Sequence, residues 1–273
     1  MPTSALLLAL AAAGVHALWN VLLANARDPR AATAIALLVA ELVFAPVTFA
    51  VWDVHAAVWP FLVASGTLQL VYFGLLATAY RLAPLSVVYP IARGVAPVLV
   101  LGVGVAVLGR ATTAGEVAGV LLVGAGVLLV RGPGRGAGRG AAFGLAIACV
   151  IATYTLVDKQ GVTHAGAVPY LELSMLGPSL VYAAVIFRRR TAAELRAELR
   201  PATFVAGIAT FGAYALVLLA LQRAAAAPVA AVRETSVVLT ALLARQVLRE
   251  TVGWQRIVGA AAVAGGIALL ALA

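Results

Sequence analysis

The stretch Arg131-Gly-Pro-Gly-Arg-Gly-Ala-Gly-Arg-Gly140 interrupts an otherwise apolar chain of 273 residues near its middle. Its glycines and proline do not continue a helix, so it predicts a connection between two structural units. Five apolar runs lie on each side of it. The sequence therefore predicts a first five-helix repeat at residues 1–131, a Gly/Arg-rich linker at 132–139 and a second five-helix repeat at 140–273.

The composition indicates that lipid is the solvent of this chain. Hydrophobic residues make up 64% of the sequence and charged residues 11%, which is more apolar surface than a water-soluble core of this size can bury. A spanning helix takes about 20 apolar residues, so ten of them take roughly 200. We expect an all-α integral membrane protein with ten transmembrane helices. The first run lacks the basic start of a removable signal peptide, so we expect it to be a permanent helix.

The ten apolar runs set the expected helix boundaries. They lie at about 4–25, 31–51, 57–80, 85–108, 114–131, 141–159, 168–187, 202–222, 226–248 and 252–272. An odd number of spans in each repeat inverts the second copy in the membrane, and inverted repeats enclose the midplane sites of many carriers.

Recurring glycines support a duplication. Glycines of the first half precede small residues of the second half by about 140 positions: Gly66 and Gly207, Gly119 and Gly259, Gly124 and Ala264, and Gly126 and Gly266. Similar hydropathy alone also aligns apolar segments, so the agreement of helix order, loop length and glycines together favours two copies.

The arginines predict the orientation. Alternate connections carry Arg27, Arg30, Arg81, Arg131, Arg135, Arg139, Arg188, Arg189, Arg190, Arg196, Arg200, Arg245, Arg249 and Arg256. The other connections carry only Arg110, Lys159 and Arg223. By the positive-inside rule the arginine-rich set faces the cytoplasm, and both termini lie outside a bacterial inner membrane. This placement also accounts for the net charge of +9 without nucleic acid as a partner.

Two charged residues are expected near the middle of the membrane. Arg93 lies about eight residues into its run, or roughly 12 Å, and Glu234 lies a similar distance into a run that enters from the opposite face. Ionisable groups at this depth are costly and are functional candidates. Together with Arg233 they either bind a charged substrate or a proton, or form a structural salt bridge between the two halves.

Glu41 is a second candidate for proton coupling, beside Glu234. It lies near the middle of the run 31–51 and has no cationic neighbour in that run. Desolvation favours the protonated form of such a carboxyl, which makes Glu41 a candidate proton carrier. The alternative is a permanent pair with Arg93 or Arg233.

The segment Tyr89-Pro90-Ile91-Ala92-Arg93-Gly94, followed by Pro97, predicts irregular backbone beside the central arginine. Proline removes a backbone donor and frees a carbonyl, so we expect the helix to bend or locally unwind there. Unwound backbone at mid-depth recurs in substrate sites. Tyr89 is therefore included among the candidate substrate ligands.

Other polar residues of the apolar runs are candidates of two kinds. His16, Trp19 and Asn20 share one helix face and either bind a ligand or join helices. Gln69, Tyr72 and Tyr154 are further candidates. Glu172, and Asp158 with Lys159 as a pair, lie near run ends and are expected at the membrane interface.

Several site types are not indicated. The single cysteine, Cys149, excludes an internal disulfide and indicates no metal site. We predict no cofactor. Gly115 with Gly119, and Gly140 with Gly144, form close-packing faces that join helices within one chain or make a homodimer, so a monomer and a homodimer both remain open.

The chain resembles a ten-helix carrier of the drug/metabolite transporter superfamily, EamA type. The segments that carry the resemblance are His16-Ala-Leu-Trp-Asn20, Tyr89-Pro-Ile-Ala-Arg-Gly94, Tyr154-Thr-Leu-Val-Asp-Lys159 and Arg233-Glu-Thr-Ser236. The sequence departs from the family at Ala24 and Asn25, where a lysine is usual after Trp-Asn, and at Gly109-Arg110, where Gly-Glu is usual.

The resemblance implies a basket of helices around a central cavity. The third, fourth, eighth and ninth runs would line the cavity, and the fifth and tenth would lie at the periphery. It also implies transport of small organic solutes such as amino acids, sugars or drugs, often outward and driven by protons.

We therefore expect a secondary transporter of small polar or zwitterionic metabolites, working by alternating access as a proton-coupled exporter. The alternatives are an uptake carrier for a small organic anion or sugar, and a flippase for an anionic lipid carrier. An enzyme is not expected, because the sequence contains no paired metal ligands, nucleophile elbow or phosphate loop.

Overall fold

The computed structural model describes residues 1–83, 85–131, 137–240 and 254–273. Within these ranges the chain is all α, apart from one isolated bridge between Val54 and Ala165. The α-helices with described bounds are α1 Thr3–Ala24, α2 Pro29–Ala50, α3 Trp59–Leu82, α4 Leu85–Ala106, α5 Ala114–Arg131, α6 Ala137–Gly161, α7 Ala167–Phe187, α8 Ala192–Ala197, α9 Pro201–Arg223, α10 Ala226–Arg233 and α12 Trp254–Leu272. A 3-10 helix, η1, covers Ala56–Val58.

Seven helices in the described part of the chain are long and apolar enough to cross a membrane. Two shorter apolar helices, Ala114–Val130 and Ile257–Leu272, match the fifth and tenth predicted runs. The all-α membrane fold is therefore confirmed. The ten-helix plan is not, because eleven α-helices have described bounds.

Two segments contribute to this difference between the predicted and the observed helices. The predicted run 226–248 begins as α10, is interrupted at Glu234 and continues as helix over residues 235–240. The remainder of that run lies outside the described residues, as do Arg245, Arg249, Arg135 and linker residues 132–136. The segment between α7 and α9 forms the short helix α8, which begins with a capping box between Thr191 and Glu194.

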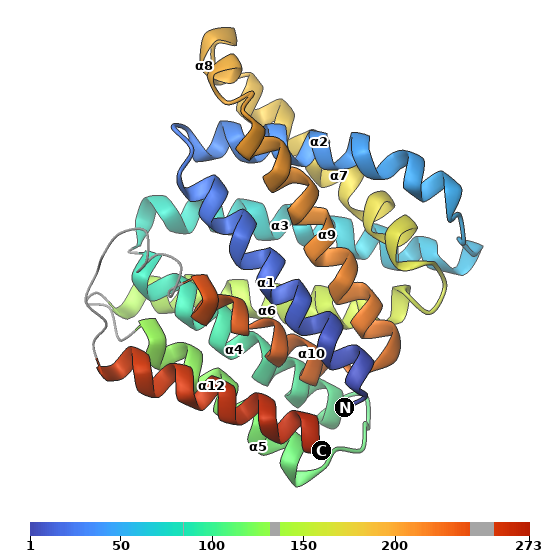
Figure 1. Ribbon diagram of the computed structural model, residues 1–273, viewed down its shortest axis with the longest axis vertical. Coiled ribbons are helices and arrows are strands. Elements are labelled where there is room, and N and C mark those ends of the chain that lie inside the picture. Colours follow the sequence, from blue (N-terminus) through green and yellow to red (C-terminus); the bar gives the residue numbers. More distant parts are fainter. Residues whose placement is uncertain (84, 132–136, 241–253) are drawn as a thin grey trace.

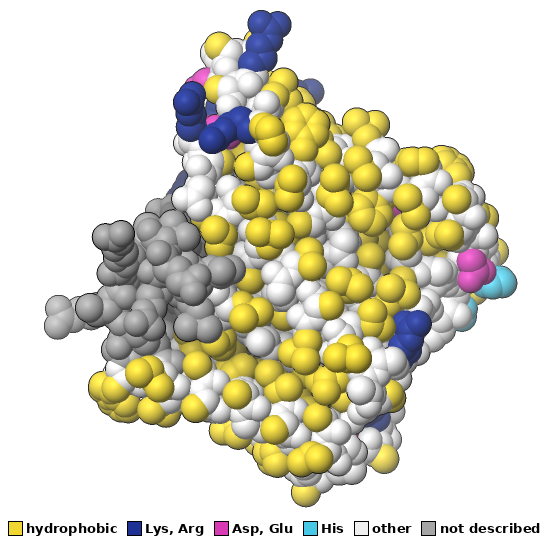
Figure 2. All heavy atoms as spheres, in the orientation of Figure 1, with side chains coloured by type: hydrophobic (Ala, Val, Ile, Leu, Met, Phe, Trp, Pro, Cys, Tyr) yellow, Lys and Arg dark blue, Asp and Glu magenta, His cyan; other side chains and the backbone are white. Residues whose placement is uncertain are grey.

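The outer surface has the apolar character expected in lipid. Large hydrophobic side chains such as Leu7, Phe49 and Leu272 are 62%, 75% and 88% exposed. Figure 2 shows hydrophobic side chains spread over most of the visible face, with a group of cations at α8. Water would disfavour such a surface by about 25 cal/mol for each Å² of apolar area, whereas lipid does not.

The helices pack as a bundle in which α10 occupies a central position. α10 contacts α1, α4, α5, α6, α9 and α12. α5 and α12 pack side by side at one edge of the bundle, while α2 and α7 pack together at the opposite edge (Figure 1). The amino group of Met1 donates to the carbonyl oxygen of Leu270 at 2.9 Å, so both termini lie at the same end.

Glycine contacts bring several helix pairs unusually close. A Cβ atom on Gly119 would lie 2.9 Å from the carbonyl oxygen of Gly266, and one on Gly126 would lie 2.7 Å from that of Gly259. These contacts join α5 to α12. The small-residue pattern therefore serves packing within the chain, as in other membrane bundles.

The closest such approach joins α9 to α2. A Cβ atom on Gly207 would lie 2.4 Å from the carbonyl oxygen of Ala36, whereas one on Gly212 of the same helix meets no atom within 4 Å. We predict that Gly207→Ala lowers stability by about 1–3 kcal/mol, because the two helix backbones must separate. Thermal unfolding in detergent measures this change.

Gly212→Ala is the matched control. Alanine favours helix over glycine by about 1 kcal/mol, so this substitution should leave stability unchanged or raise it. Equal losses in both variants would contradict close packing at Gly207.

Candidate functional site

An ion pair between α4 and the end of α10 forms the centre of the candidate site. Nε of Arg93 lies 2.9 Å from Oε2 of Glu234, and the two side chains are 8% and 1% exposed. Arg93 comes from the first half of the chain and Glu234 from the second. The expected meeting of these two residues is observed, and a buried pair of this kind satisfies two charges that would each be costly alone.

Further polar groups complete the surroundings of Arg93. Its Nη2 lies 3.4 Å from Oγ of Ser236 and 3.4 Å from Nε2 of His16. The guanidinium carbon lies 6.0 Å from the ring centre of Tyr89, at the outer limit of a cation–π contact. Arg93 is thus surrounded by groups from α1, α4 and the segment after α10.

Arg233 adds a second buried cation beside the pair. Its Nε lies 3.8 Å from Oε1 of Glu234. Its guanidinium also interacts with Tyr154 and lies close to Tyr214 and Asp158. Glu234 thus sits between two guanidinium groups, and Asp158 supplies a second anion to the same polar interior.

Asp158 belongs to this interior, and the predicted pair of Asp158 with Lys159 is wrong. Asp158 is 0% exposed. Its carboxylate accepts hydrogen bonds from the hydroxyl of Tyr170 at 2.8 Å and from the hydroxyl of Tyr214. Lys159 instead donates to the carbonyl oxygen of Leu221 at 2.5 Å.

The physical reason for this correction is helix length. α6 extends to Gly161 and packs against α3, α4, α9 and α10, so a residue near its end is still enclosed by protein. Tyr154 and Asp158 are four residues apart and share a helix face, which is the sequence signal that points to their common role.

The residues of the predicted polar face of α1 differ in what they contact: His16 lies beside the central arginine, whereas Asn20 bonds within its own helix. His16 lies beside Arg93 and packs edge-to-face on Trp19, with ring centres 4.7 Å apart. Asn20 donates from its side chain to the carbonyl oxygen of His16 at 2.8 Å, so it stabilises its own helix. The indole nitrogen of Trp19 is buried without a hydrogen-bond partner among the described residues.

The candidates on α3 are placed at different distances from the centre. Tyr72 packs edge-to-face on Tyr154 at 6.5 Å and lies close enough to Arg93 to interact electrostatically. Tyr154 in turn packs on Tyr214 at 6.4 Å. Gln69 is buried on α3 but does not contribute to the Arg93 contacts described above.

Glu41 lies apart from the central cluster. It faces Glu172 and Ser179 across the α2–α7 contact, and no arginine of the described residues is among its interaction partners. The alternative of a pair with Arg93 or Arg233 is therefore not observed. Glu172, expected at the membrane interface, is 7% exposed and enclosed by protein.

The predicted unwinding of α4 is wrong. α4 is continuous from Leu85 to Ala106 through Pro90 and Pro97. The interruption lies instead opposite Arg93, at Glu234, where the amide of Glu234 donates to the carbonyl oxygen of Ala231 at 3.0 Å and α10 ends. Neighbouring helices can stabilise a proline-containing transmembrane helix such as α4. Glu234, at the break, lies between the guanidinium groups of Arg93 and Arg233.

A cavity of about 150 Å³ lies at the end of the bundle that holds both termini. Its lining includes Met1, Pro228, and the ion pair of Arg110 and Glu116, whose Nη1 and Oε1 atoms are 2.8 Å apart. Arg110 occupies the position where the resemblance led us to expect glutamate. None of the central charged residues lines this cavity, so their placement in a central cavity stays a prediction.

Comparison with known proteins identifies the family of the chain. The model of the EamA-like transporter family matches residues 138–272. The chain belongs to the EamA-like transporter family. Its members are membrane transporters of the drug/metabolite type, so the transporter class and the multi-pass membrane location follow.

A solved structure shares the fold of this EamA-like transporter. It is described as "Crystal structure of protein", has a TM-score of 0.77 and is 19% identical, with 100% of this chain and 98% of the other covered. No match was found among the curated proteins.

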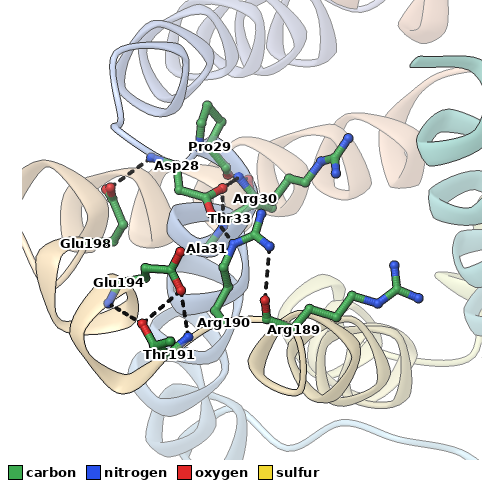
Figure 3. Close-up of polar contacts among 10 residues, drawn as sticks. All are labelled: Asp28, Pro29, Arg30, Ala31, Thr33, Arg189, Arg190, Thr191, Glu194 and Glu198. Atoms are coloured by element: carbon green, nitrogen blue, oxygen red, sulfur yellow. Dashed lines mark hydrogen bonds and ion pairs between the residues drawn. The ribbon is translucent and has the colours of Figure 1, made fainter. Parts of the chain in front are cut away.

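A polar cluster at the opposite end from the termini ties the two halves of the transporter together. Asp28 caps α2 by accepting hydrogen bonds from the amides of Arg30 and Ala31 at 3.0 and 3.3 Å, and it also binds the guanidinium of Arg190 (Figure 3). The amide of Asp28 donates to Oε1 of Glu198 at 2.9 Å. The connection between α1 and α2 is thus held by the segment between α7 and α9.

The hydrogen bonds and charges of this cluster lower the pKa values of two carboxyl groups. The hydrogen bond from Arg190 is the main factor that lowers the pKa of Asp28, and backbone amides contribute. The amide and then the hydroxyl of Thr191 lower the pKa of Glu194, with a smaller effect from Arg190. Both carboxylates are therefore ionised at neutral pH.

We predict that Glu234→Gln destabilises the transporter by about 3–5 kcal/mol, because Arg93 and Arg233 then remain buried without their shared anion. Thermal or denaturant unfolding in detergent measures the loss. Glu116→Gln is the control: its partner Arg110 is 37% exposed, so the expected cost is at most about 1 kcal/mol. Similar costs for both substitutions would show that Glu234 does not neutralise the central arginines.

The lowered pKa of Asp28 makes part of the stability dependent on pH. This contribution is fully present above the unfolded value of about 3.9 and is lost as pH falls through the lower folded value. Asp28→Asn keeps the helix cap but removes the ion pair, so we expect it to cost about 0.2–1 kcal/mol at neutral pH. The difference from the parent protein in thermal unfolding should disappear in acid. A difference that stays constant down to acid pH would contradict an ionic origin.

Proposed function

We propose that this EamA-like transporter is a secondary active carrier of small polar or zwitterionic metabolites. The carrying observation is the buried ion pair of Arg93 and Glu234, which joins the two halves of the chain. A substrate that carries a carboxylate and an amine can replace Glu234 as the partner of Arg93 and replace Arg93 as the partner of Glu234. Arg93 then binds the carboxylate and Glu234 the amine, while Arg233, Tyr89, His16 and Tyr72 surround the substrate.

Exchange of ion-pair partners offers a physical basis for selectivity. In the substrate-free state Glu234 neutralises Arg93, so the buried charges are satisfied. A zwitterion preserves this balance, whereas an ion of one sign leaves a charge uncompensated at low dielectric. Trp19, with its buried indole nitrogen free among the described residues, supplies a further donor close to His16. Gln69 and Asn20 are the outer members of the proposed binding set.

The interruption at Glu234 supports transport by alternating access. Discontinuous helices at mid-depth place backbone groups and helix ends beside the substrate in many carriers. Here α10 ends at Arg233, Glu234 occupies the break and helix resumes at residue 235, so the anion of the central ion pair lies at a helix end. Movement of the two halves about this point would expose the pair to one side of the membrane at a time.

The proposed mechanism uses two inverted repeats, at residues 1–131 and 140–273, linked by 132–139. Reciprocal contacts support this arrangement. Gly119 packs on Gly266 while Gly126 packs on Gly259, and the backbone of Ser174 meets Gly66 while that of Ala36 meets Gly207. Each contact is repeated with the roles of the halves exchanged, as a two-fold axis between copies requires.

We place the carrier in the bacterial cytoplasmic membrane with both termini outside. Arginines of the α1–α2 connection, of the segment after α7 and of α8 gather at one end of the bundle. The termini lie at the other end (Figure 1). The positive-inside rule assigns the arginine-rich end to the cytoplasm. Export coupled to inward proton movement is the direction we propose, with Glu41 or Glu234 as the proton-binding group.

Proteoliposome transport under an imposed pH gradient tests this function. A ligand-stability screen across amino acids, organic anions, sugars and cationic drugs first selects substrates by thermal shift. We expect zwitterionic compounds to stabilise the protein and to be transported. Arg93→Ala should reduce transport of them at least about tenfold, the equivalent of one lost charged contact of about 1.4 kcal/mol or more.

Arg223→Ala is the matched control, because Arg223 is exposed and donates only to the carbonyl oxygen of Leu219 in its own helix among the described contacts. It should transport at the parental rate. Full activity of a folded Arg93→Ala variant with every substrate would assign the central pair a structural role only.

A further inference from the structure

Two carboxyl groups from different halves of the chain lie against each other inside the bundle. Glu41 of α2 and Glu172 of α7 interact across the contact between these helices, and they are 6% and 7% exposed. They share their surroundings with Ser179, which is 0% exposed and faces Glu41. This carboxyl pair is separate from the Arg93–Glu234 centre.

The carboxyl pair has fewer donors around it than acceptor oxygens. Both oxygens of Glu41, Oε2 of Glu172 and Oγ of Ser179 are buried without a hydrogen bond of normal geometry to any described residue. Two carboxylates only accept hydrogen bonds, and the single hydroxyl of Ser179 has one proton to donate. A buried, unfilled acceptor costs about 1–3 kcal/mol, and more when it is charged. The group therefore needs an additional positively charged or donating ligand.

No described cation of the surrounding helices fills this need. The elements packed on α2 and α7 include α1, α3, α8 and α9. The charged groups on them lie elsewhere: Arg223 binds its own helix at the end of α9, and Arg81 lies in the last turn of α3. The cations of the α2 and α7 ends, Arg30 and Arg190, gather around Asp28 and Tyr182. Within the described residues, only Glu41 and Glu172 act on each other by charge at this point.

We propose that Glu41 and Glu172 form a binding site for one shared proton. Two like charges in contact at low dielectric cannot both be ionised, and a single proton between them supplies the missing donor. A metal cation is disfavoured as the occupant, because hard cations such as Ca²⁺ take about six to eight oxygen ligands and this site offers the oxygens of three side chains. In the described part of the chain, no three acidic, histidine or cysteine side chains are grouped to hold a metal.

The position of the shared proton connects it to the transport cycle; this step rests on the proposed function. α2 and α7 belong to opposite halves of the chain and contact one another directly. With the proton present, the pair carries one negative charge and its two members attract through a hydrogen bond. Loss of the proton leaves two repelling carboxylates at the contact, so proton release favours separation of the halves. The site thereby differs from Glu234, which has guanidinium partners.

Labelling with a hydrophobic carbodiimide tests the proposal without knowledge of the substrate. The reagent adds to a protonated carboxyl group, so it reports the shared proton directly. We expect Glu41 or Glu172, identified by peptide mass spectrometry, to be labelled at neutral pH in the full-length protein in detergent or liposomes. Labelling should reach one adduct per chain and fall about tenfold per pH unit above the transition. Glu116, a buried carboxylate paired with Arg110, is the internal control and should stay unlabelled.

The variants separate a shared proton from two independent ones. Glu172→Gln removes the like charge, so the labelling transition of Glu41 should move to lower pH by at least about one unit. Glu41→Gln should do the same for Glu172. Transitions that coincide with the parental one, or no labelling of either residue at neutral pH, would overturn the proposal. If a variant does not fold, labelling of the parent protein still tests the proposal, because the absence of any adduct on Glu41 or Glu172 at neutral pH contradicts it.

The outcome remains distinguishable from the fate of the transport proposal. Labelling of the carboxyl pair together with absent transport of every tested substrate would support the proton site and contradict the carrier function. Transport that depends on a pH gradient, with no labelling and an unchanged gradient dependence in Glu172→Gln, would support the carrier and overturn the shared proton.

Discussion

The cost of burying a charge away from water governs the interior of this transporter. Arg93 and Arg233 are almost completely enclosed, and neither is stable there without an anion. Glu234 lies between them, and Asp158 adds a second carboxylate held by two tyrosine hydroxyls. Because Arg93 and Glu234 come from opposite halves, charge neutralisation also specifies how the halves meet. The same contacts make the centre suitable for an ionic ligand, which can replace one partner with another.

Close backbone packing allows these charges to meet. Lipid supplies little hydrophobic force between helices, so association depends on small residues and on complementary polar groups. Gly207 against Ala36 and Gly126 against Gly259 bring the backbones of α9 and α2, and of α5 and α12, into close contact. The neighbouring helices α1, α4, α5, α6, α9 and α12 enclose α10, and the break that follows it at Glu234 lies beside Arg93. The ion pairs and the glycine contacts support one another, since each positions the helices that the other requires.

Much of the charged centre was predictable because depth in the membrane follows from position in an apolar run. Arg93 and Glu234 lie at similar depths from opposite faces, and they meet in the structure. The expected depth in the membrane did not predict which residues neighbouring helices bury. Asp158 and Glu172 lie near helix ends, yet neighbouring helices bury both. Prolines in α4 suggested an interruption beside Arg93. The interruption occurs instead across the site, at Glu234, where α10 ends.

The sequence by itself determined the membrane environment and the helical class, because composition and run length depend only on local chain chemistry and on the thickness of the bilayer. Only the tertiary structure decided the partners. Glu41 meets Glu172 and not an arginine, and Arg233 reaches Tyr154 and not lipid. These contacts depend on the rotation and crossing of helices far apart in the chain, which side-chain packing sets and which no single apolar run encodes.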